Sequence, residues 1–282
     1  MKYDVAIIGA GPAGLSAALN LKLHNKNIIW FGSADLSIKV DKAEQVANYP
    51  GLSMVSGEEL NENFRKQIKD MDLVITDKLV TTINQSDAGF MLLADNEVYE
   101  ASALLLAMGA VSGKPYDGEE ELLGRGVSYC ATCDGYLYKG KTIAAVATSE
   151  KFEHEVKYLA ELAEKIYLIP LYKDCSVNLP NVEIIKSNIK AINGDMRVSG
   201  MTLIDGREIA VDGVFLLRNA IAPTTLIKGL TVDGPHIVVN RNMETNIKGC
   251  FAAGDCTGRP YQIAKSVGEG NVAAHAILDI LG

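Results

Sequence analysis

The sequence predicts an α/β protein made of two Rossmann-like nucleotide-binding domains, with the second domain inserted into the first. Two observations predict this fold class. Stretches that begin near residues 3 and 142 share the order strand, turn, helix, strand, and alternating strands and helices favour parallel sheets covered by helices on both faces. The length of 282 residues also allows two domains, because single cores usually stop growing at about 250–300 residues.

The first stretch has an apolar strand over residues 3–8, a glycine-rich turn, a helix over 15–21 and a second strand over 27–31. In this context Gly9 permits a tight turn, Gly11 lets the backbone approach a pyrophosphate, and Gly14 lets the helix lie close to the strand. Pro12 suits the first position of a helix, whose N–H groups attract phosphates. The turn therefore predicts a bound dinucleotide; the alternative is a packing turn without a ligand.

The second stretch has a strand over residues 142–147, a helix over 151–164 with one apolar stripe, and a strand over 165–169. Glycine and polar residues at 109–113 and 233–235 resemble two crossings between domains. We therefore expect the first domain over residues 1–111 and 236–282, and the inserted domain over 112–235. Further strands are expected at 73–75, 90–94, 103–107, 184–186, 214–217, 237–239 and 250–252.

Composition restricts the partners and the location. The formal charge of −8 argues against nucleic acid, because phosphate binding needs a cationic surface. No apolar run reaches the ~18 residues that span a membrane, and the N-terminus shows no cleavable signal. We therefore expect a cytoplasmic protein. The four histidines are scattered and there is no second cysteine pair, so we expect no metal site.

Cys130 and Cys133 lie two residues apart, and Asp134 follows directly. This spacing lets two thiols close a reversible disulfide, which stores two electrons without a metal. A zinc site and a pair of inert core cysteines are the alternatives. Cys256, next to the carboxylate of Asp255, is either a packing residue or a secondary redox group.

These motifs together resemble the low-molecular-weight thioredoxin reductases. The N-terminal turn, the Asn-Tyr-Pro-Gly run at 48–51, the Cys-Ala-Thr-Cys-Asp run at 130–134 and the Phe-Ala-Ala-Gly-Asp run at 251–255 have that family's order and spacing. The resemblance covers essentially the whole chain. It implies a homodimer with non-covalent FAD at the first turn, its ring facing the cysteines, and thioredoxin as the acceptor. It also implies that Cys133 faces the flavin, Cys130 attacks thioredoxin, and Asp134 acts as acid or base.

The resemblance assigns further residues to FAD. A carboxylate after the strand at 250–252 would accept hydrogen bonds from the sugar-alcohol chain. The chain departs from the family at residues 34–40, where a Gly-Gly-Gln segment is usual, and at Met108, where threonine is usual. The expected FAD-contacting residues are Gly9, Gly11, Pro12, Ala13, Gly14, Phe31, Gly32, Asn48, Ala107, Gly109, Gly254, Asp255, Gln262 and Ile263.

The inserted domain lacks the residues that a pyridine nucleotide needs. NADPH-using relatives carry a Gly-x-Gly-x-x-Ala turn there, and the aligned positions in this chain are Ala147, Ser149 and Phe152. A Cβ stands where the turn needs none, and Phe152 is too large for close contact between helix and strand. Glu150 places negative charge where a pyrophosphate would lie. The single lysine within residues 170–173 cannot replace the arginine pair that holds a 2′-phosphate.

An intact cysteine pair without a nicotinamide site needs another electron donor. A flavin can accept electrons one at a time, so reduced ferredoxin can load it in two steps. The sequence resembles the ferredoxin-dependent flavin thioredoxin reductases, and we expect a flavoprotein disulfide reductase that takes electrons from ferredoxin. The alternatives are an NAD(P)H-dependent enzyme with an atypical nicotinamide site, a flavin-bound redox sensor, and an enzyme with a second flavin in the inserted domain.

Overall fold

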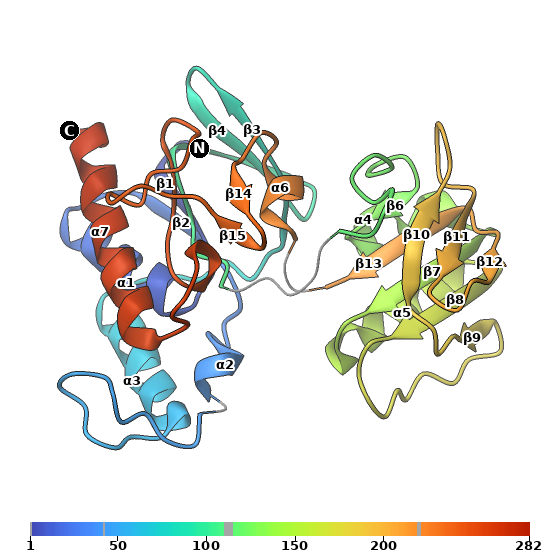
Figure 1. The fold of residues 1–282 in the computed structure, drawn as a ribbon, viewed down its shortest axis with the longest axis horizontal. Helices are drawn as coiled ribbons and strands as arrows, with labels where there is room; N and C mark the ends of the chain where they lie inside the picture. The colour runs from blue at the N-terminus through green and yellow to red at the C-terminus, as the bar shows by residue number, and fades with distance from the viewer. Residues whose placement is uncertain (1, 42, 110–114, 219–220) are drawn as a thin grey trace. The chain divides into compact units, whose positions relative to one another are not determined.

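The computed structural model describes residues 2–41, 43–109, 115–218 and 221–282 (Figure 1). The chain divides into two compact units, one formed by residues 1–113 and 222–282 and the other by residues 114–221. Each unit contains a sheet with parallel strands and at least one covering helix. The predicted α/β class, with one Rossmann-like unit inserted into the other, is confirmed.

The second crossing between the units lies near residue 221 and not at the expected boundary of 235/236. Helix α6 (Pro223–Leu226) packs against a strand of the first unit, and Ile227 forms a bridge with Ile83. The Asp-Gly-Pro run at 233–235 is the turn of a short hairpin between β14 (Val232–Asp233) and β15 (His236–Ile237). The glycine and proline at residues 233–235 therefore belong to a hairpin turn and not to a crossing between the domains. The expected first crossing at 111/112 lies outside the described residues.

The first unit has a mixed sheet in which strands β2, β1, β5 and β16 run parallel, and β5, β4 and β3 form an antiparallel meander. The expected strand at 73–75 is wrong: only Thr76 forms a bridge, to Phe31, and Leu73 is buried in the core shared with α3. The strands are β1 (Lys2–Ile8), β2 (Ile28–Phe31), β3 (Val80–Ser86), β4 (Gly89–Ala94), β5 (Glu97–Leu106) and β16 (Cys250–Ala252).

The long helices of this unit share one hydrophobic core with the sheet. Helices α1 (Pro12–Leu23) and α7 (Ile263–Leu281) pack against each other (Figure 1). Helix α3 (Gly57–Asp70) is capped by Ser56, whose hydroxyl accepts a hydrogen bond from the Glu59 N–H at 3.1 Å. The shorter helical segments are α2 (Ile38–Asp41) and the 3₁₀ turn η3 (Asp255–Thr257).

The inserted unit has a parallel sheet in the order β6, β13, β7, β8, β9 and a small antiparallel sheet in the order β10, β11, β12. The predicted helix over 151–164 consists of a 3₁₀ turn followed by an α-helix that ends at Leu162. The strands are β6 (Val127–Ser128), β7 (Thr142–Ala147), β8 (Lys165–Pro170), β9 (Val182–Ile184), β10 (Ile189–Asn193), β11 (Gly200–Leu203), β12 (Glu208–Ile209) and β13 (Gly213–Leu217). The helical segments are α4 (Ala131–Asp134), η1 (Gly135–Tyr138), η2 (Glu150–Phe152) and α5 (Glu153–Leu162). No helix in the described ranges is long and apolar enough to cross a bilayer.

Two glycines of α7 provide a test of the contact between α1 and α7. A Cβ on Gly270 would lie 2.2 Å from the Ala13 carbonyl oxygen, whereas a Cβ on Gly268 would meet nothing within 4 Å. We expect Gly270→Ala to lower the free energy of unfolding by about 1–3 kcal/mol. Gly268→Ala should raise it by about 0.5–1 kcal/mol, because alanine favours helix. Denaturant unfolding measures both, and equal effects of the two changes would contradict the role of this contact.

Candidate functional site

The glycine-rich turn of the first unit is tight at its two ends and open in the middle. Gly9 has a φ of +115°, and a Cβ on it would lie 2.1 Å from the Ala107 carbonyl oxygen. A Cβ on Gly14 would lie 2.0 Å from the Gly9 carbonyl oxygen. Gly11, in contrast, has no atom within 4 Å of its Cβ position and is the N-cap of α1. The open side of the turn thus exposes helix N–H groups, as binding of a pyrophosphate requires.

Trp30, a residue that the sequence analysis did not single out, fixes this turn. Its side chain is fully buried, and its indole Nε1–H donates a hydrogen bond to the Gly9 carbonyl at 2.9 Å. The Gly9 N–H donates to the Phe31 carbonyl at 2.7 Å. A buried indole N–H usually finds an acceptor, so the single tryptophan of the chain, at the end of an apolar strand, was a signal for such an anchor.

Phe31 and Gly32 support the turn from the end of β2. The Phe31 ring is 1% exposed and packs edge-to-face on Tyr99, with ring centroids 5.1 Å apart. Its side chain therefore belongs to the core and only its backbone reaches the turn. A Cβ on Gly32 would lie 2.6 Å from the Ala10 Cβ, so glycine is needed for β2 to end beside the turn.

The Gly-Asp segment after β16 meets the same turn, although about 240 residues separate them in the sequence. Gly254 has a φ of +88°, and a Cβ on it would lie 2.9 Å from the Ala13 Cβ. The Asp255 side chain is 18% exposed and lies 3.4 Å from the Ser266 hydroxyl and 3.9 Å from Lys39 Nζ. The structure thus brings Gly254 to the predicted dinucleotide turn, and Asp255 directly follows it in the chain.

A partly buried ion pair of α7 bonds to the backbone of this segment. Lys265 Nζ lies 3.0 Å from the Glu269 carboxylate and donates to the Gly254 carbonyl at 2.8 Å and the Gly258 carbonyl at 2.9 Å. The Glu269 carboxylate accepts hydrogen bonds from the Gly254 N–H and the Thr257 hydroxyl. Side chains of α7 therefore bond the N–H and the carbonyl of Gly254 and the carbonyl of Gly258.

The remaining residues of the expected FAD set lie near these elements of the first unit. Gln262 is the N-cap of α7, Ile263 is its first residue, and the Gln262 side-chain oxygen accepts a hydrogen bond from Asn48 at 3.4 Å. Ala107 directly follows β5 and is buried, and Gly109 has a φ of +71°. Asn48 and Gln262 are exposed, so their amides are available to a ligand.

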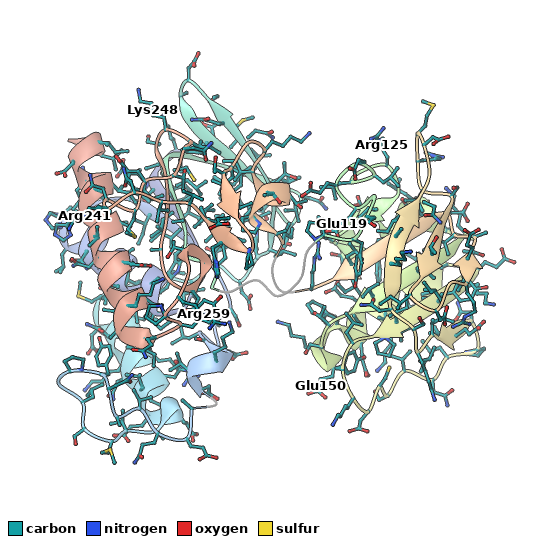
Figure 2. All side chains as sticks on the ribbon, viewed as in Figure 1. Glu119, Arg125, Glu150, Arg241, Lys248 and Arg259 are labelled. Carbon is teal, nitrogen blue, oxygen red and sulfur yellow. The ribbon has the colours of Figure 1, made fainter. Side chains whose placement is uncertain are left out.

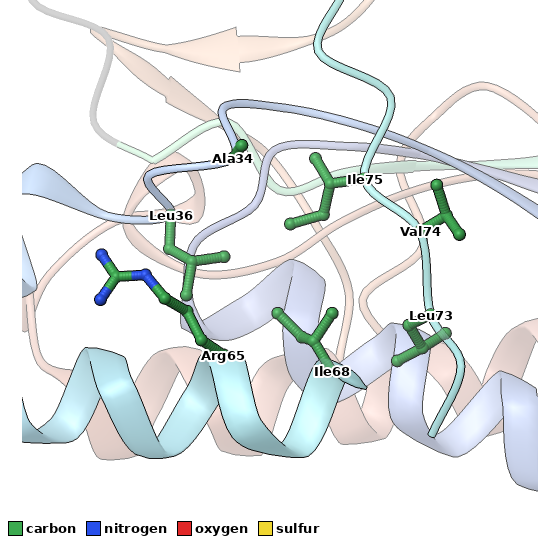
Figure 3. Close-up of a pocket in the computed structure, with 7 residues that line it drawn as sticks. All are labelled: Ala34, Leu36, Arg65, Ile68, Leu73, Val74 and Ile75. Carbon is green, nitrogen blue, oxygen red and sulfur yellow. The ribbon is translucent and has the colours of Figure 1, made fainter. Parts of the chain in front are cut away.

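An apolar pocket of about 290 Å³ lies beyond the end of β2, between α3 and the segment before Thr76 (Figure 3). Arg65 is the single charged side chain among its lining residues, and it extends along one side of the pocket in Figure 3. The pocket has few polar groups and therefore suits a flat apolar group better than a phosphate. Its lining residues are Ala34, Leu36, Arg65, Ile68, Leu73, Val74 and Ile75.

The predicted redox motif lies in the inserted unit, where β6 ends and α4 begins. Ser128, which the sequence analysis did not single out, organises it: its hydroxyl donates to the Asp134 carboxylate at 2.6 Å and accepts from the Cys130 N–H at 3.1 Å. A serine two residues before the cysteine is a recognised signal for such a local turn. The Asp134 N–H donates to the Cys130 carbonyl at 3.2 Å, so Cys130 and Asp134 occupy the same helical turn.

Cys130 is partly buried and disulfide-bonded. The side chain of Cys133 lies outside the described part of the structure, so its pairing stays a prediction. Cys256, in contrast, is 2% exposed, and burial raises the pKa of its thiol to about 12. A thiol with this pKa remains protonated at neutral pH, which favours a packing role for Cys256 over a redox role.

A buried ion pair supports the residue before Cys130. The fully buried Glu119 carboxylate accepts hydrogen bonds from the Tyr129 hydroxyl at 2.6 Å and the Tyr116 N–H at 2.9 Å, and it pairs with Arg218. The Arg218 guanidinium lies 4.9 Å from the centre of the Tyr129 ring. Burial, together with the negative charge of Glu119, raises the pKa of Tyr129. This Glu119 network links the segment before β6 to the residue that follows β13; Glu119 is labelled in Figure 2.

At the edge of the inserted sheet that would receive a nucleotide, side chains stand where the NADPH-using pattern has two glycines and an alanine. Ala147 is fully buried at the end of β7, and Phe152 is 9% exposed within the same hydrophobic core. Glu153, at the start of α5, points its carboxylate at the loop after β8, where it accepts hydrogen bonds from Tyr172 at 3.0 Å and from the N–H of Ser176 at 2.9 Å. These bonds, those of Ser176 foremost, lower the pKa of Glu153. A second carboxylate besides the exposed Glu150 therefore opposes a phosphate at this edge.

The structure contains no group of three or more potential ligands that could hold a metal ion among the residues it describes.

Comparisons with known proteins agree with this arrangement. A family model described as "Pyridine nucleotide-disulphide oxidoreductase" matches residues 3–270. A thioredoxin reductase of Treponema pallidum is 32% identical over 293 aligned positions, covering 97% of this chain and 95% of the relative. A crystal structure of a ferredoxin-flavin thioredoxin reductase from Clostridium acetobutylicum matches with a TM-score of 0.92 and 45% identity, covering 100% of this chain and 98% of that one. A thioredoxin reductase from Gloeobacter violaceus matches with a TM-score of 0.81 and 28% identity, covering 99% and 94%.

The Glu119 network predicts a stability effect. Glu119→Gln removes the charge that balances Arg218, and breaking a buried pair from one side leaves the other charge uncompensated. We expect the free energy of unfolding of the inserted unit to fall by about 3 kcal/mol, measured by denaturant titration. Glu183→Gln, in the solvent-exposed pair with Lys165, is the matched control and should leave stability almost unchanged. Equal effects of both variants would contradict a structural role for the network.

Proposed function

Because the chain belongs to the pyridine nucleotide-disulphide oxidoreductase family and matches thioredoxin reductases over nearly its whole length, we propose that it is a flavoprotein disulfide reductase. In this proposal it reduces thioredoxin, or a thioredoxin-like protein, through FAD and the pair Cys130 and Cys133. Its electrons come from reduced ferredoxin rather than NADPH. We further propose that it acts in the cytoplasm as a homodimer, as the family resemblance implies.

The first unit offers the features that FAD requires. Gly11 leaves room for a pyrophosphate at the start of α1, and Asp255, next to the Gly254 that contacts this turn, has a partly exposed carboxylate suited to the hydroxyls of a sugar-alcohol chain. Gln262 and Asn48 offer exposed amides. When bound, FAD supplies the ability to accept electrons singly and to pass them on as a pair.

The observation that carries the choice of donor is the set of side chains at this edge of the inserted sheet. Ala147 and Phe152 are buried core residues at two positions where the NADPH-using pattern has glycine and alanine, and the Glu153 carboxylate is directed at the loop after β8. The solved structure from Clostridium acetobutylicum, described as a ferredoxin-flavin thioredoxin reductase, supports ferredoxin as the donor. Both observations favour a one-electron carrier over a nicotinamide.

The thiol chemistry follows from the pair and its flanking groups. In the dithiol state, the Cys130 thiolate attacks one sulfur of the thioredoxin disulfide, forms a mixed disulfide and releases a thiolate that takes up a proton. The Cys133 thiolate then attacks the Cys130 sulfur, which re-forms the disulfide of this chain and releases the second thiolate of thioredoxin. Two electrons and two protons restore the dithiol. Asp134, oriented by Ser128, holds or returns a proton in these exchanges.

Parallel assays with reduced ferredoxin, NADPH and NADH test the proposal. Thioredoxin reduction should proceed with ferredoxin and be at least about 100-fold slower with either nicotinamide, a loss typical when binding groups are absent. Rapid bleaching of the flavin by NADPH would favour an atypical nicotinamide enzyme, and failure of all donors to give repeated turnover would favour a redox sensor. Two flavins per chain would indicate a second site in the inserted unit.

The Cys133→Ser variant tests the role of the cysteine pair. It should keep its yellow colour and lose thioredoxin reduction, because the mixed disulfide cannot be resolved.

The turn of the first unit allows FAD binding to be separated from folding. Gly11→Ala adds a methyl group into open space with an allowed φ of −78°, so melting of the apoprotein should be unchanged while flavin affinity falls by about 10-fold or more. Gly14→Ala meets the Gly9 carbonyl and should lower both apoprotein stability and flavin content. Flavin absorbance per chain and thermal melting measure the two effects. A Gly11→Ala protein with undiminished flavin affinity would place the cofactor elsewhere.

A further inference from the structure

The loop after the Gly-Asp segment, residues 258–262, is exposed but held in one shape. Its first carbonyl, of Gly258, accepts a hydrogen bond from the partly buried Lys265 at 2.9 Å, and the Gln262 N–H donates to the Pro260 carbonyl at 3.0 Å. Arg259, Pro260 and Tyr261 lie between these anchors on the surface. A surface that is already ordered loses little conformational entropy when a partner binds it.

The side chains of this loop form a small cluster with His236 of β15. Tyr261 is 45% exposed, its hydroxyl lies 2.6 Å from His236 Nε2, and the Arg259 guanidinium lies 5.7 Å from the centre of the Tyr261 ring. Arginine and tyrosine are enriched in the residues that dominate protein interfaces. The cluster of Arg259, Tyr261 and His236 therefore has the composition of a docking surface.

Arg259 forms no ion pair within the part of the chain that the structure describes. Asp255, four residues earlier in the chain, lies 3.9 Å from Lys39 Nζ. The guanidinium therefore presents its positive charge to solvent on a chain whose net charge is −8. An acidic partner is repelled by the chain as a whole, so it needs local cations to bind at one place.

The position of Arg259 and Tyr261 in the chain also favours a role in electron delivery. Arg259 and Tyr261 lie between Asp255 and Gln262, two residues of the expected flavin set. We propose that the cluster of Arg259, Tyr261 and His236 is the docking surface for the acidic, one-electron donor protein, a role that rests on the proposed function. The donor then approaches the first unit beside the segment expected to contact the flavin.

A charge reversal at Arg259 tests this, with Lys248→Glu as the matched control. Both side chains are exposed, both belong to the first unit, and they lie apart in Figure 2. Each variant changes the net charge by the same amount, so long-range repulsion rises similarly in both. We expect Arg259→Glu to lower kcat/KM for an acidic reduced ferredoxin by about 10-fold or more, and Lys248→Glu to change it less than about 2-fold.

Thioredoxin reduction driven by dithionite, a small reductant that needs no docking surface, should be similar in the wild type and both variants. Flavin content and thermal melting confirm that Arg259→Glu is folded, and Arg259→Lys should retain most of the rate because it keeps the charge. Equal losses in Arg259→Glu and Lys248→Glu, or no loss in either, would overturn the docking surface while leaving the donor intact. A wild-type protein that ferredoxin cannot reduce would instead overturn the proposed function.

Discussion

The first unit depends on backbone segments that approach too closely for a side chain to lie between them. Gly9 lies against the carbonyl of Ala107, Gly14 against the carbonyl of Gly9, and Gly270 against the carbonyl of Ala13. These contacts bring β1, β5, α1 and α7 around one turn. Because protein interiors are densely packed, the position of the turn is set by its neighbours as much as by its own residues. The open space at Gly11 therefore depends on the packing of all these elements and not on the turn alone.

The inserted unit repeats the order strand, turn, helix, but its corresponding turn at residues 147–152 contains no glycine. Ala147 and Phe152 fill the core where the first unit has glycines, and a 3₁₀ turn precedes the α-helix. The Glu153 carboxylate, in the first turn of that helix, is satisfied by protein donors from the following loop. The same topology therefore supports a glycine turn with open space at Gly11 in one unit and a turn with larger side chains in the other. Side-chain size and charge at a few positions make the difference.

The sequence contained enough to predict the fold class and the tight glycine turn between β1 and α1, because glycine spacing and apolar strands are local signals. The crossing near residue 221 was missed, because a hairpin turn and a linker use the same loop-forming residues. The support of Cys130 was also missed: Glu119 and Arg218 are 99 positions apart, and only the folded sheet brings them together. Long-range polar pairs of this kind leave no periodic pattern in the sequence, whereas the Ser128 turn was readable from its spacing to Cys130.

A protein that exchanges disulfides must also prevent exchange at the wrong sulfur. Cys250 and Cys256 are almost completely buried, and burial raises the pKa of each thiol to about 12. At neutral pH, thiolate at these positions is scarce, so in the proposed reaction neither residue would compete as a nucleophile for the mixed disulfide. The low reactivity of Cys250 and Cys256 would therefore direct the exchange to the pair Cys130 and Cys133. This low reactivity comes from burial in the same dense packing that shapes the first unit.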